Sequence, residues 1–189
     1  MEKNLVPHVL VPLAQGCEEL EAVTIIDLLR RAEVKVTTAS LNDQPIVASR
    51  GTKLLADTTL DQVMNQEFDM VVLPGGLPGA DHLNEDLRIH EVLKKAVAND
   101  HYIAAICAAP KVLATAGLLD NKKATAYPGV LEALENNVVD ITGVAVQQDG
   151  KVLTSRGPGT AMDFALDIIA CLVGNEKRDQ VEIALQRAN

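Results

Sequence analysis

One cysteine stands where the sequence pattern predicts that a buried strand turns into a helix. Cys107 follows the apolar run 102–106, is followed by two alanines, and precedes Pro110, a residue suited to the first turn of a helix. The N-terminal end of a helix carries positive potential, which favours a thiolate over a thiol. Because the thiolate is the nucleophilic and oxidisable form, we expect Cys107 to have a lowered pKa and to carry the chemistry.

Three glutamates, Glu18, Glu19 and Glu21, open the first predicted helix. Carboxylates in a first turn complement the helix dipole, which accounts for two of them. Glu21, however, shares a helix face with the apolar Ile25 and Leu28, so we expect its carboxyl to be partly buried. Burial raises the pKa of a carboxyl, and a protonated Glu21 could donate a hydrogen bond to a thiolate that an ionised one would repel.

A nucleophilic cysteine usually needs a base or a lowered pKa. Among the four histidines, His82 is the one that the chain order could place beside Cys107. Cys17 lies in a loop after the first predicted strand, either as a second reactive thiol or as a spectator.

Two further loops are candidates for the walls of a site. Gly75 and Gly76 follow a buried strand, and their backbone N–H groups, with that of Ala108, could form an oxyanion site. The alternative for the glycine pair is a tight turn. The segment around Pro158 either walls a pocket or simply turns the chain before a helix.

Short apolar runs alternate with helical patterns along the chain. This alternation predicts an α/β fold with a mostly parallel sheet, helices on both faces, and ligand sites at the C-terminal ends of the strands. An Asp-Gly pair between two strand-like runs predicts a β-hairpin. The predicted strands are 9–13, 34–39, 70–73, 102–106, 144–148 and 151–155, with 46–49 and 53–56 as a short pair at the sheet's edge; the predicted helices are 18–31, 85–99, one from Cys107 to about 118, 160–173 and a last polar helix.

The composition is that of a soluble globular protein. The chain has 189 residues, of which 48% are hydrophobic and 23% charged, and no linker or repeat divides it, so we expect one domain over 1–189. A net charge of −9 argues against a nucleic-acid partner. No run is apolar for long enough to cross a membrane, and the first residues do not resemble a signal peptide. Three irregularly spaced cysteines predict neither disulfides nor a metal site, so we expect a cytoplasmic protein with reduced thiols.

Four segments together resemble the ThiJ/PfpI superfamily, in the branch of the parkinsonism-associated deglycase and bacterial YajL-type proteins. Each segment alone is weak evidence, but together they follow the family's order along nearly the whole chain. They are GCEELE at 16–21, VLPGG at 72–76, AAICA at 104–108 and LTSRGPGT at 153–160. The resemblance implies a flavodoxin-like three-layer α/β/α sandwich, a homodimer and no cofactor.

The resemblance also implies roles for individual residues. Cys107 matches the family's reactive cysteine and Glu21 matches its protonated glutamate partner. Gly76 and Ala108 match the backbone donors around the thiol, with Gly75 beside them.

Arg50 matches a dimer-interface arginine near the site. Tyr127 stands where human-type members carry a pocket histidine, and Asp27 matches the acidic neighbour of that histidine. A tyrosine hydroxyl donates hydrogen bonds but is a poor base near neutral pH, so this departure puts any step that needs an imidazole in doubt. Ala108 replaces the histidine of the protease branch, and the His-x-Glu of amidotransferase relatives is missing, so proteolysis and glutamine hydrolysis are not expected.

The resemblance supplies the substrate class, namely methylglyoxal and glyoxal, free or attached to protein thiols and amines. The first hypothesis is therefore a cofactor-independent cysteine enzyme of the glyoxalase or protein deglycase type, acting in the response to oxidative and carbonyl stress. The second is a redox-sensing chaperone whose Cys107 is oxidised to the sulfinate without turnover. A third is that the fold persists without a catalytic use.

Overall fold

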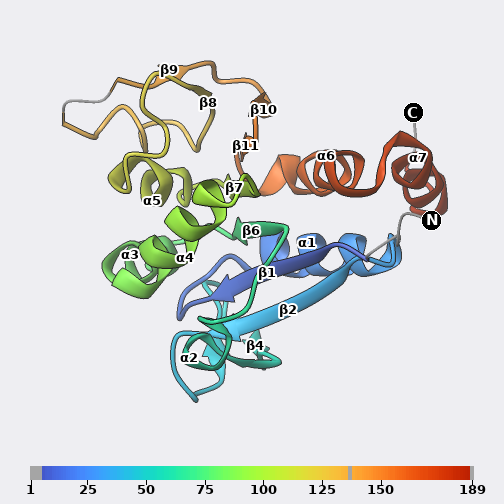
Figure 1. Cartoon of the computed structure of the whole chain (residues 1–189), viewed down its shortest axis with the longest axis horizontal. Helices are drawn as coiled ribbons and strands as arrows, with labels where there is room; N and C mark the ends of the chain where they lie inside the picture. The colour runs from blue at the N-terminus through green and yellow to red at the C-terminus, as the bar shows by residue number, and fades with distance from the viewer. Residues whose placement is uncertain (1–5, 136–137, 188–189) are drawn as a thin grey trace.

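The computed structural model describes residues 6–135 and 138–187, and its centre is a seven-stranded sheet (Figure 1). Within the described strands, every pairing in this sheet is parallel except the antiparallel pair at one edge, which confirms the predicted hairpin. From edge to edge the strands are β10 (Val146–Asp149), β11 (Val152–Ser155), β7 (Tyr102–Ile106), β6 (Met70–Leu73), β1 (His8–Leu13), β2 (Lys35–Ser40) and β5 (Thr58–Thr59).

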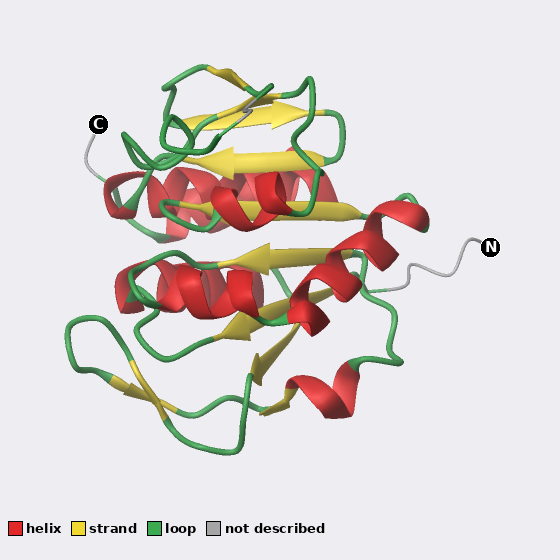
Figure 2. Cartoon of the chain, turned by 90° about the vertical axis from the view of Figure 1, so that its left-hand side faces the viewer, coloured by secondary structure: helices red, strands yellow, loops and turns green. Residues whose placement is uncertain are grey.

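Helices cover both faces of the sheet, so the molecule has three layers (Figure 2). Successive side chains of β1 point to opposite faces, and Val9 therefore lies in one apolar core and Leu10 in the other. Strands buried on both faces are nearly continuous apolar runs, as the sequence of β1 and β6 shows. The first core includes α1 (Glu19–Arg31), α6 (Ala161–Val173) and α7 (Asn175–Ala184), and the second includes α2 (Leu60–Val63), α4 (Leu87–Ala98) and α5 (Pro110–Thr115).

The strand order confirms the predicted flavodoxin-like sandwich. Taken in chain order, β2-β1-β6-β7-β11 is the 2-1-3-4-5 arrangement of that fold. Its topological switch point lies between β1 and β6, and the loops that leave the C-terminal ends of these strands are where ligands bind in such sheets. None of the described helices is both long and apolar enough to cross a bilayer.

The short pair predicted at the sheet's edge is placed elsewhere. β3 (Ile46–Val47) and β4 (Lys53–Leu54) form a separate antiparallel sheet, because β5 occupies the edge beside β2. The 45–52 segment instead hydrogen-bonds to the loop after β1: Gly16 N donates to Val47 O at 2.9 Å, and Ser49 N donates to Cys17 O at 2.8 Å. The pair itself is present as predicted, and its place at the sheet's edge was wrong because this contact joins segments about thirty residues apart in sequence and leaves no local pattern.

The helix predicted over 85–99 is α4, and a separate helix that the sequence patterns did not predict, α3 (Gly79–Glu85), precedes it. Asp86 separates them, since its backbone is extended and its Oδ1 accepts a hydrogen bond from Arg88 N at 3.0 Å, as in an N-cap. The helix after Cys107 ends at Thr115, before the predicted 118. The sequence patterns did not predict α2, nor the short parallel pair β8 (Lys123–Ala124) and β9 (Asp140–Ile141).

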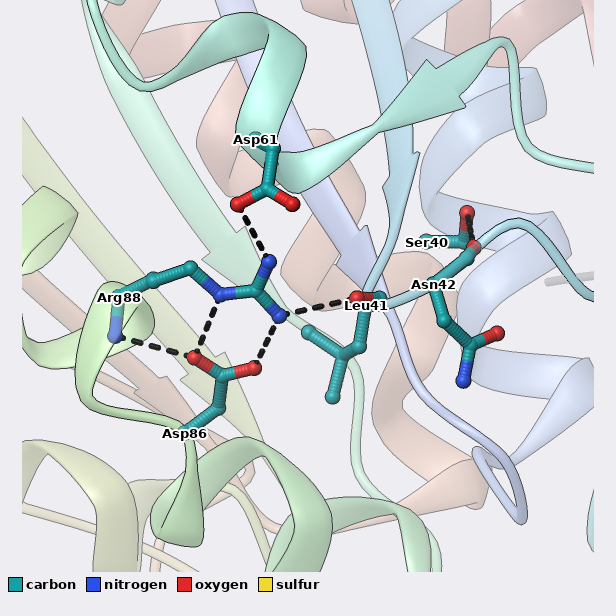
Figure 3. Close-up of polar contacts among 6 residues, drawn as sticks. All are labelled: Ser40, Leu41, Asn42, Asp61, Asp86 and Arg88. Atoms are coloured by element: carbon teal, nitrogen blue, oxygen red, sulfur yellow. Dashed lines mark hydrogen bonds and ion pairs between the residues drawn. The ribbon is translucent and has the colours of Figure 1, made fainter.

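Arg88 joins three segments at the edge of the sheet where β2 ends (Figure 3). Its guanidinium donates to Asp86 in a two-pronged contact at 2.9 and 2.5 Å, to Asp61 of α2 at 2.6 Å, and to Leu41 O at 2.9 Å. Arginine suits this position because its planar fork presents several donors in fixed directions. The contact fixes the start of α4 and the end of β2 relative to each other.

Candidate functional site

Cys107 lies in the turn between β7 and α5 with a φ of 63°, in the left-handed region that residues other than glycine rarely adopt. Its backbone is held on both sides. Cys107 N donates to Ser155 O at 2.9 Å, and Tyr127 N donates to Cys107 O at 2.9 Å. Uncommon backbone conformations held in this way cluster at functional sites, and this one presents the cysteine side chain at the C-terminal end of β7.

Cys107 is 9% exposed, and the backbone N–H groups of Gly76 and Ala108 interact with its thiol. Burial raises the pKa of the thiol to about 12, and the negative charge of Glu21 adds to the rise, while the two N–H groups lower it. The predicted lowering of this pKa is therefore wrong for a site in which Glu21 is ionised. The helix that follows is only six residues long, and its potential does not offset burial beside a carboxylate.

Glu21 is fully buried, as its place on the apolar stripe of α1 predicted. Its Oε2 accepts a hydrogen bond from Gly75 N at 2.8 Å. Its Oε1 is buried without a well-formed hydrogen bond among the described residues, although the carboxyl and the Cys107 thiol interact and shift each other's pKa. Burial raises the pKa of Glu21 to about 7, with the charge of Glu18 adding to the rise.

The thiol and the carboxyl therefore titrate as a pair rather than as two independent groups. Below pH 7 both Glu21 and Cys107 hold a proton. Above pH 7 one proton remains for the two groups, and it can reside on sulfur or on the carboxyl. An ionised Glu21 beside a neutral thiol is a base in position to accept the thiol's proton as the sulfur attacks.

The raised pKa of Glu21 predicts a pH-dependent cost to folding. The pKa is about 7 in the folded protein and 4.5 for an unperturbed glutamate, the value taken for the unfolded chain. The protonated group therefore contributes stability that is fully present below pH 4.5 and is lost as the pH rises through 7. Glu21→Gln should therefore raise the free energy of unfolding by up to about 3 kcal/mol at pH 8 and change it little at pH 4. Urea unfolding of both proteins at pH 4, 6 and 8 measures this difference, and a difference independent of pH would contradict it.

Glu19 supplies a matched control with the opposite sign. Burial alone would raise its pKa, but the backbone N–H groups of Glu19, Arg50 and Thr52 outweigh burial and lower the pKa to about 2. Its contribution to stability is therefore present above pH 4.5 and is lost as the pH falls toward 2. Glu19→Gln should destabilise the protein at pH 8, where Glu21→Gln stabilises it.

The two glycines after β6 leave room that a side chain would fill. A Cβ on Gly75 would lie 2.6 Å from Cys107 Cβ and 2.8 Å from Glu21 Oε2, and a Cβ on Gly76 would lie 2.3 Å from Glu18 N. Gly76 also has a φ of 89°, which favours glycine. Gly75 was predicted as an oxyanion donor, but its N–H is engaged by Glu21, so its part is to bring the carboxyl and the thiol together.

The loop at 15–19 joins the site to the turn that carries Arg50. On one side Glu18 N donates to Gly75 O at 2.9 Å. On the other side the Glu19 carboxylate accepts from Arg50 N at 3.0 and 3.1 Å and from Thr52 N at 3.3 Å. The sequence assigned Glu19 only to the helix dipole and missed this contact, because its partners lie more than thirty residues away.

Tyr127 and Pro158 line the same cavity. Its volume is about 320 Å³, and Arg156, which belongs to the LTSRGPGT segment at 153–160, also lines it. Asp27 does not join them, since its Oδ2 accepts from Arg31 Nε at 2.7 Å one turn further along α1. Two of the candidate pocket residues, Tyr127 and Pro158, therefore line one cavity, and Asp27 makes its contact elsewhere.

His82 and Cys17 are the remaining candidates. His82 lines a different cavity, of about 360 Å³ at the ends of β1 and β2, where its Nδ1 lies 2.9 Å from Gln15 O. Cys17 is 1% exposed, against 9% for Cys107, which favours the alternative of a spectator. Burial raises the pKa of the Cys17 thiol to about 11, with the charge of Glu19 adding to the rise. No group of three or more His, Cys, Asp or Glu side chains among the described residues is arranged to hold a metal ion.

Comparison with known proteins supports the resemblance seen in the sequence. A model of the DJ-1/PfpI family matches residues 7–171. Protein DJ-1 homolog A of Arabidopsis thaliana is 45% identical over 184 residues, and the chain spans about half the length of that relative (47%). Protein dj-1beta of Drosophila melanogaster is 45% identical over 173 residues, which cover 91% of this chain and 92% of that protein.

One relative carries an activity in its name. Glutathione-independent glyoxalase DJR-1.2 of Caenorhabditis elegans is 34% identical over 88% of this chain and 89% of its own length. Among solved structures, Drosophila melanogaster DJ-1beta matches with a TM-score of 0.93 and 43% identity, covering 98% of this chain and 100% of that one. Since the family model spans both Glu21 and Cys107 and these relatives cover most of the sequence, the chain belongs to the DJ-1/PfpI family.

Proposed function

We propose that the protein is a cofactor-independent cysteine enzyme that converts methylglyoxal and glyoxal, free or as adducts on proteins, to hydroxy acids. The observation that carries this proposal is the Cys107–Glu21 pair: a thiol and a carboxyl of raised pKa buried together, with the backbone N–H groups of Gly76 and Ala108 directed at the sulfur. A nucleophile, a proton carrier and charge stabilisers are the three parts that such a reaction needs. The glyoxalase named among the relatives supports the same chemistry.

In the first step the Cys107 sulfur bonds to the aldehyde carbon of methylglyoxal. The thiol proton passes to Glu21 and then to the aldehyde oxygen, which gives a hemithioacetal. As the sulfur–carbon bond forms, negative charge develops on the aldehyde oxygen, and the N–H groups of Gly76 and Ala108 stabilise this charge. Glu21 is the base because it is the titratable side chain that interacts with the thiol.

In the second step Glu21 removes the proton from the hemithioacetal carbon and a proton returns to the neighbouring carbonyl carbon. The product is a thioester of lactate on Cys107, and water hydrolyses it to lactate and the free thiol. One carbon of the substrate is oxidised and its neighbour is reduced, so the reaction needs no external oxidant or reductant. Water is the only co-reactant. Glyoxal gives glycolate by the same route.

The test is the appearance of product, not the loss of substrate. Wild type and Cys107→Ser are incubated with methylglyoxal in D₂O, and lactate is followed by proton NMR. We expect lactate from wild type only, with deuterium at its C2 because the proton carried by Glu21 exchanges with solvent. Loss of methylglyoxal without lactate, or equal lactate from Cys107→Ser, would show that the protein merely scavenges the aldehyde.

A redox-sensing chaperone is the second candidate, favoured by the same N–H groups. Oxidation of Cys107 to the sulfinate by peroxide would place two oxygens where Gly76 N and Ala108 N can donate, and a protonated Glu21 could donate a third hydrogen bond. Mass spectrometry after mild peroxide treatment distinguishes the two functions. Fast, selective oxidation of Cys107 combined with negligible lactate formation would favour the sensor.

The remaining expectations belong to the same proposal. We propose a cytoplasmic homodimer in which Arg50 lies near the interface, with neither a nucleic acid nor a membrane as partner. The turn that carries Arg50 hydrogen-bonds to Glu19, so an interface there would be connected to the site through the 15–19 loop. Sedimentation of the wild type and of Arg50→Glu measures the association.

A further inference from the structure

The cavity whose wall at Tyr127 is hydrogen-bonded to the Cys107 backbone has the composition of a site for a negatively charged group. It is lined by a tyrosine, two prolines, two glycines, a threonine and an arginine, and no carboxylate is among them: Tyr127, Pro128, Arg156, Gly157, Pro158, Gly159 and Thr160. Its wall is attached to the nucleophile by two backbone hydrogen bonds, from Tyr127 N to Cys107 O and from Cys107 N to Ser155 O. These two hydrogen bonds fix the position of the turn that carries Cys107 relative to the wall of the cavity.

Arg156 differs from most arginines of this chain. Five of the seven arginines pair with carboxylates, namely Arg30, Arg31, Arg88, Arg178 and Arg187. Arg156 is exposed and donates from its Nη1 to Gly143 O at 3.1 Å, and it makes no ion pair with the described residues. In a chain of net charge −9, the exposed guanidinium of a residue that lines this cavity, with no carboxylate partner among the described residues, can bind an anion from solution.

Two neighbouring features favour the same kind of ligand. The cavity borders the N-terminal end of the thirteen-residue helix α6, where the helix dipole is positive, and Asp163 in its first turn is already paired with Arg187. Tyr127 is 53% exposed and, with Pro128 and Pro158, offers apolar surface in the same cavity that Arg156 lines. A small organic acid matches this combination of an apolar wall and a cation.

We propose that this cavity is an anion subsite, in which Arg156 gives Cys107 a preference for electrophiles that carry a carboxylate a few atoms from the reacting carbon. The proposal rests on Cys107 as the nucleophile of the proposed function and adds the class of substrate. Carbonyl adducts of thiols or peptides with a nearby carboxylate are then better substrates than their neutral counterparts. Arg156 is a binding residue in this account and takes no part in proton transfer.

Alkylation tests the subsite without requiring turnover of any dicarbonyl. Iodoacetate and iodoacetamide react alike: the sulfur–carbon bond forms, the carbon–iodine bond breaks, iodide leaves, and the thiol proton goes to Glu21 or solvent. The two reagents differ in the carboxylate. Their rates at Cys107 are measured by mass spectrometry, and Cys171, a half-buried thiol on α6, serves as an internal reference in the same molecule.

Arg156→Gln should lower the iodoacetate-to-iodoacetamide ratio at Cys107 about fivefold while the iodoacetamide rate and the ratio at Cys171 stay unchanged. Arg156→Lys should keep part of the preference, and added salt should reduce it in wild type. Lys94→Gln, which removes one exposed charge from α4, should keep the whole preference. An unchanged ratio in Arg156→Gln, or an equal fall in Lys94→Gln, would overturn the subsite.

Turnover then separates this proposal from the proposed function. Two hemithioacetals of methylglyoxal serve as substrates: the one with 3-mercaptopropionate carries a carboxylate, and the one with 2-mercaptoethanol is its neutral counterpart. If neither yields lactate, the glyoxalase activity fails while the alkylation result still decides the subsite. If both yield lactate at equal kcat/KM in wild type, the activity stands and the subsite is wrong.

Discussion

Glu21→Gln should lower kcat/KM for methylglyoxal at least about 100-fold at pH 8, because general acid–base catalysis contributes a factor of this size or more. The amide can still accept the hydrogen bond that Gly75 N donates to Glu21 Oε2 at 2.8 Å, so the site keeps its shape. It cannot take the proton of the Cys107 thiol. Lactate formation measured on both proteins over the same substrate range gives the ratio.

The pH profile of the wild type carries the same prediction in another form. The ionised Glu21 is the active form, so kcat/KM should rise with pH through a limb near 7, the pKa to which burial raises this carboxyl. This limb should be missing in Glu21→Gln. A wild-type rate that falls above pH 7 would show instead that the protonated carboxyl is the active form.

Gly76→Ala should destabilise the fold by about 3–5 kcal/mol. Its new Cβ would lie 2.3 Å from Glu18 N and 2.8 Å from Cys17 C, both backbone atoms that cannot move aside as a flexible side chain could. The φ of 89° adds a strain that alanine does not tolerate well. Urea unfolding measures the loss, and the rate of lactate formation should fall with it, since Gly76 N donates to the sulfur.

Gly129 offers a matched control for the backbone strain alone. Its φ is 91°, and a Cβ there would meet no atom within 4 Å. Gly129→Ala should therefore cost only about 1–2 kcal/mol, the strain of a left-handed residue. Equal losses in the two variants would show that the close approach of the 16–18 backbone to Gly76 contributes nothing.

The layout of the sheet was readable from the sequence because it follows from local patterns. The apolar runs at β1, β6 and β7 and the Asp149-Gly150 turn predicted the parallel strands and the hairpin, and the apolar stripe of α1 predicted that Glu21 is buried. These signals depend on residues within one turn or one strand of each other. That residues 1–189 form a single domain stays a prediction.

The properties of the site that were missed depend on contacts between distant segments. The pKa of Cys107 was predicted to fall because a helix follows it, but burial and Glu21, which is 86 residues earlier in the chain, raise it. The N–H of Gly75 was assigned to an oxyanion and instead donates to Glu21. That Arg156 makes no ion pair with the described residues is likewise visible only when their side chains are placed in space.

The two edges of the central sheet have a consequence for protein at high concentration. At one edge β5 is two residues long and runs directly into α2, so it presents almost no free backbone to a new strand. At the other edge Asp149 of β10 accepts a hydrogen bond from Lys123 N at 2.9 Å, which holds the start of β8 against that strand. Short or covered edges hinder the strand addition that starts aggregation. Association of two copies of the chain through side-chain surfaces is therefore favoured over a continuous sheet that extends from the central sheet across an interface.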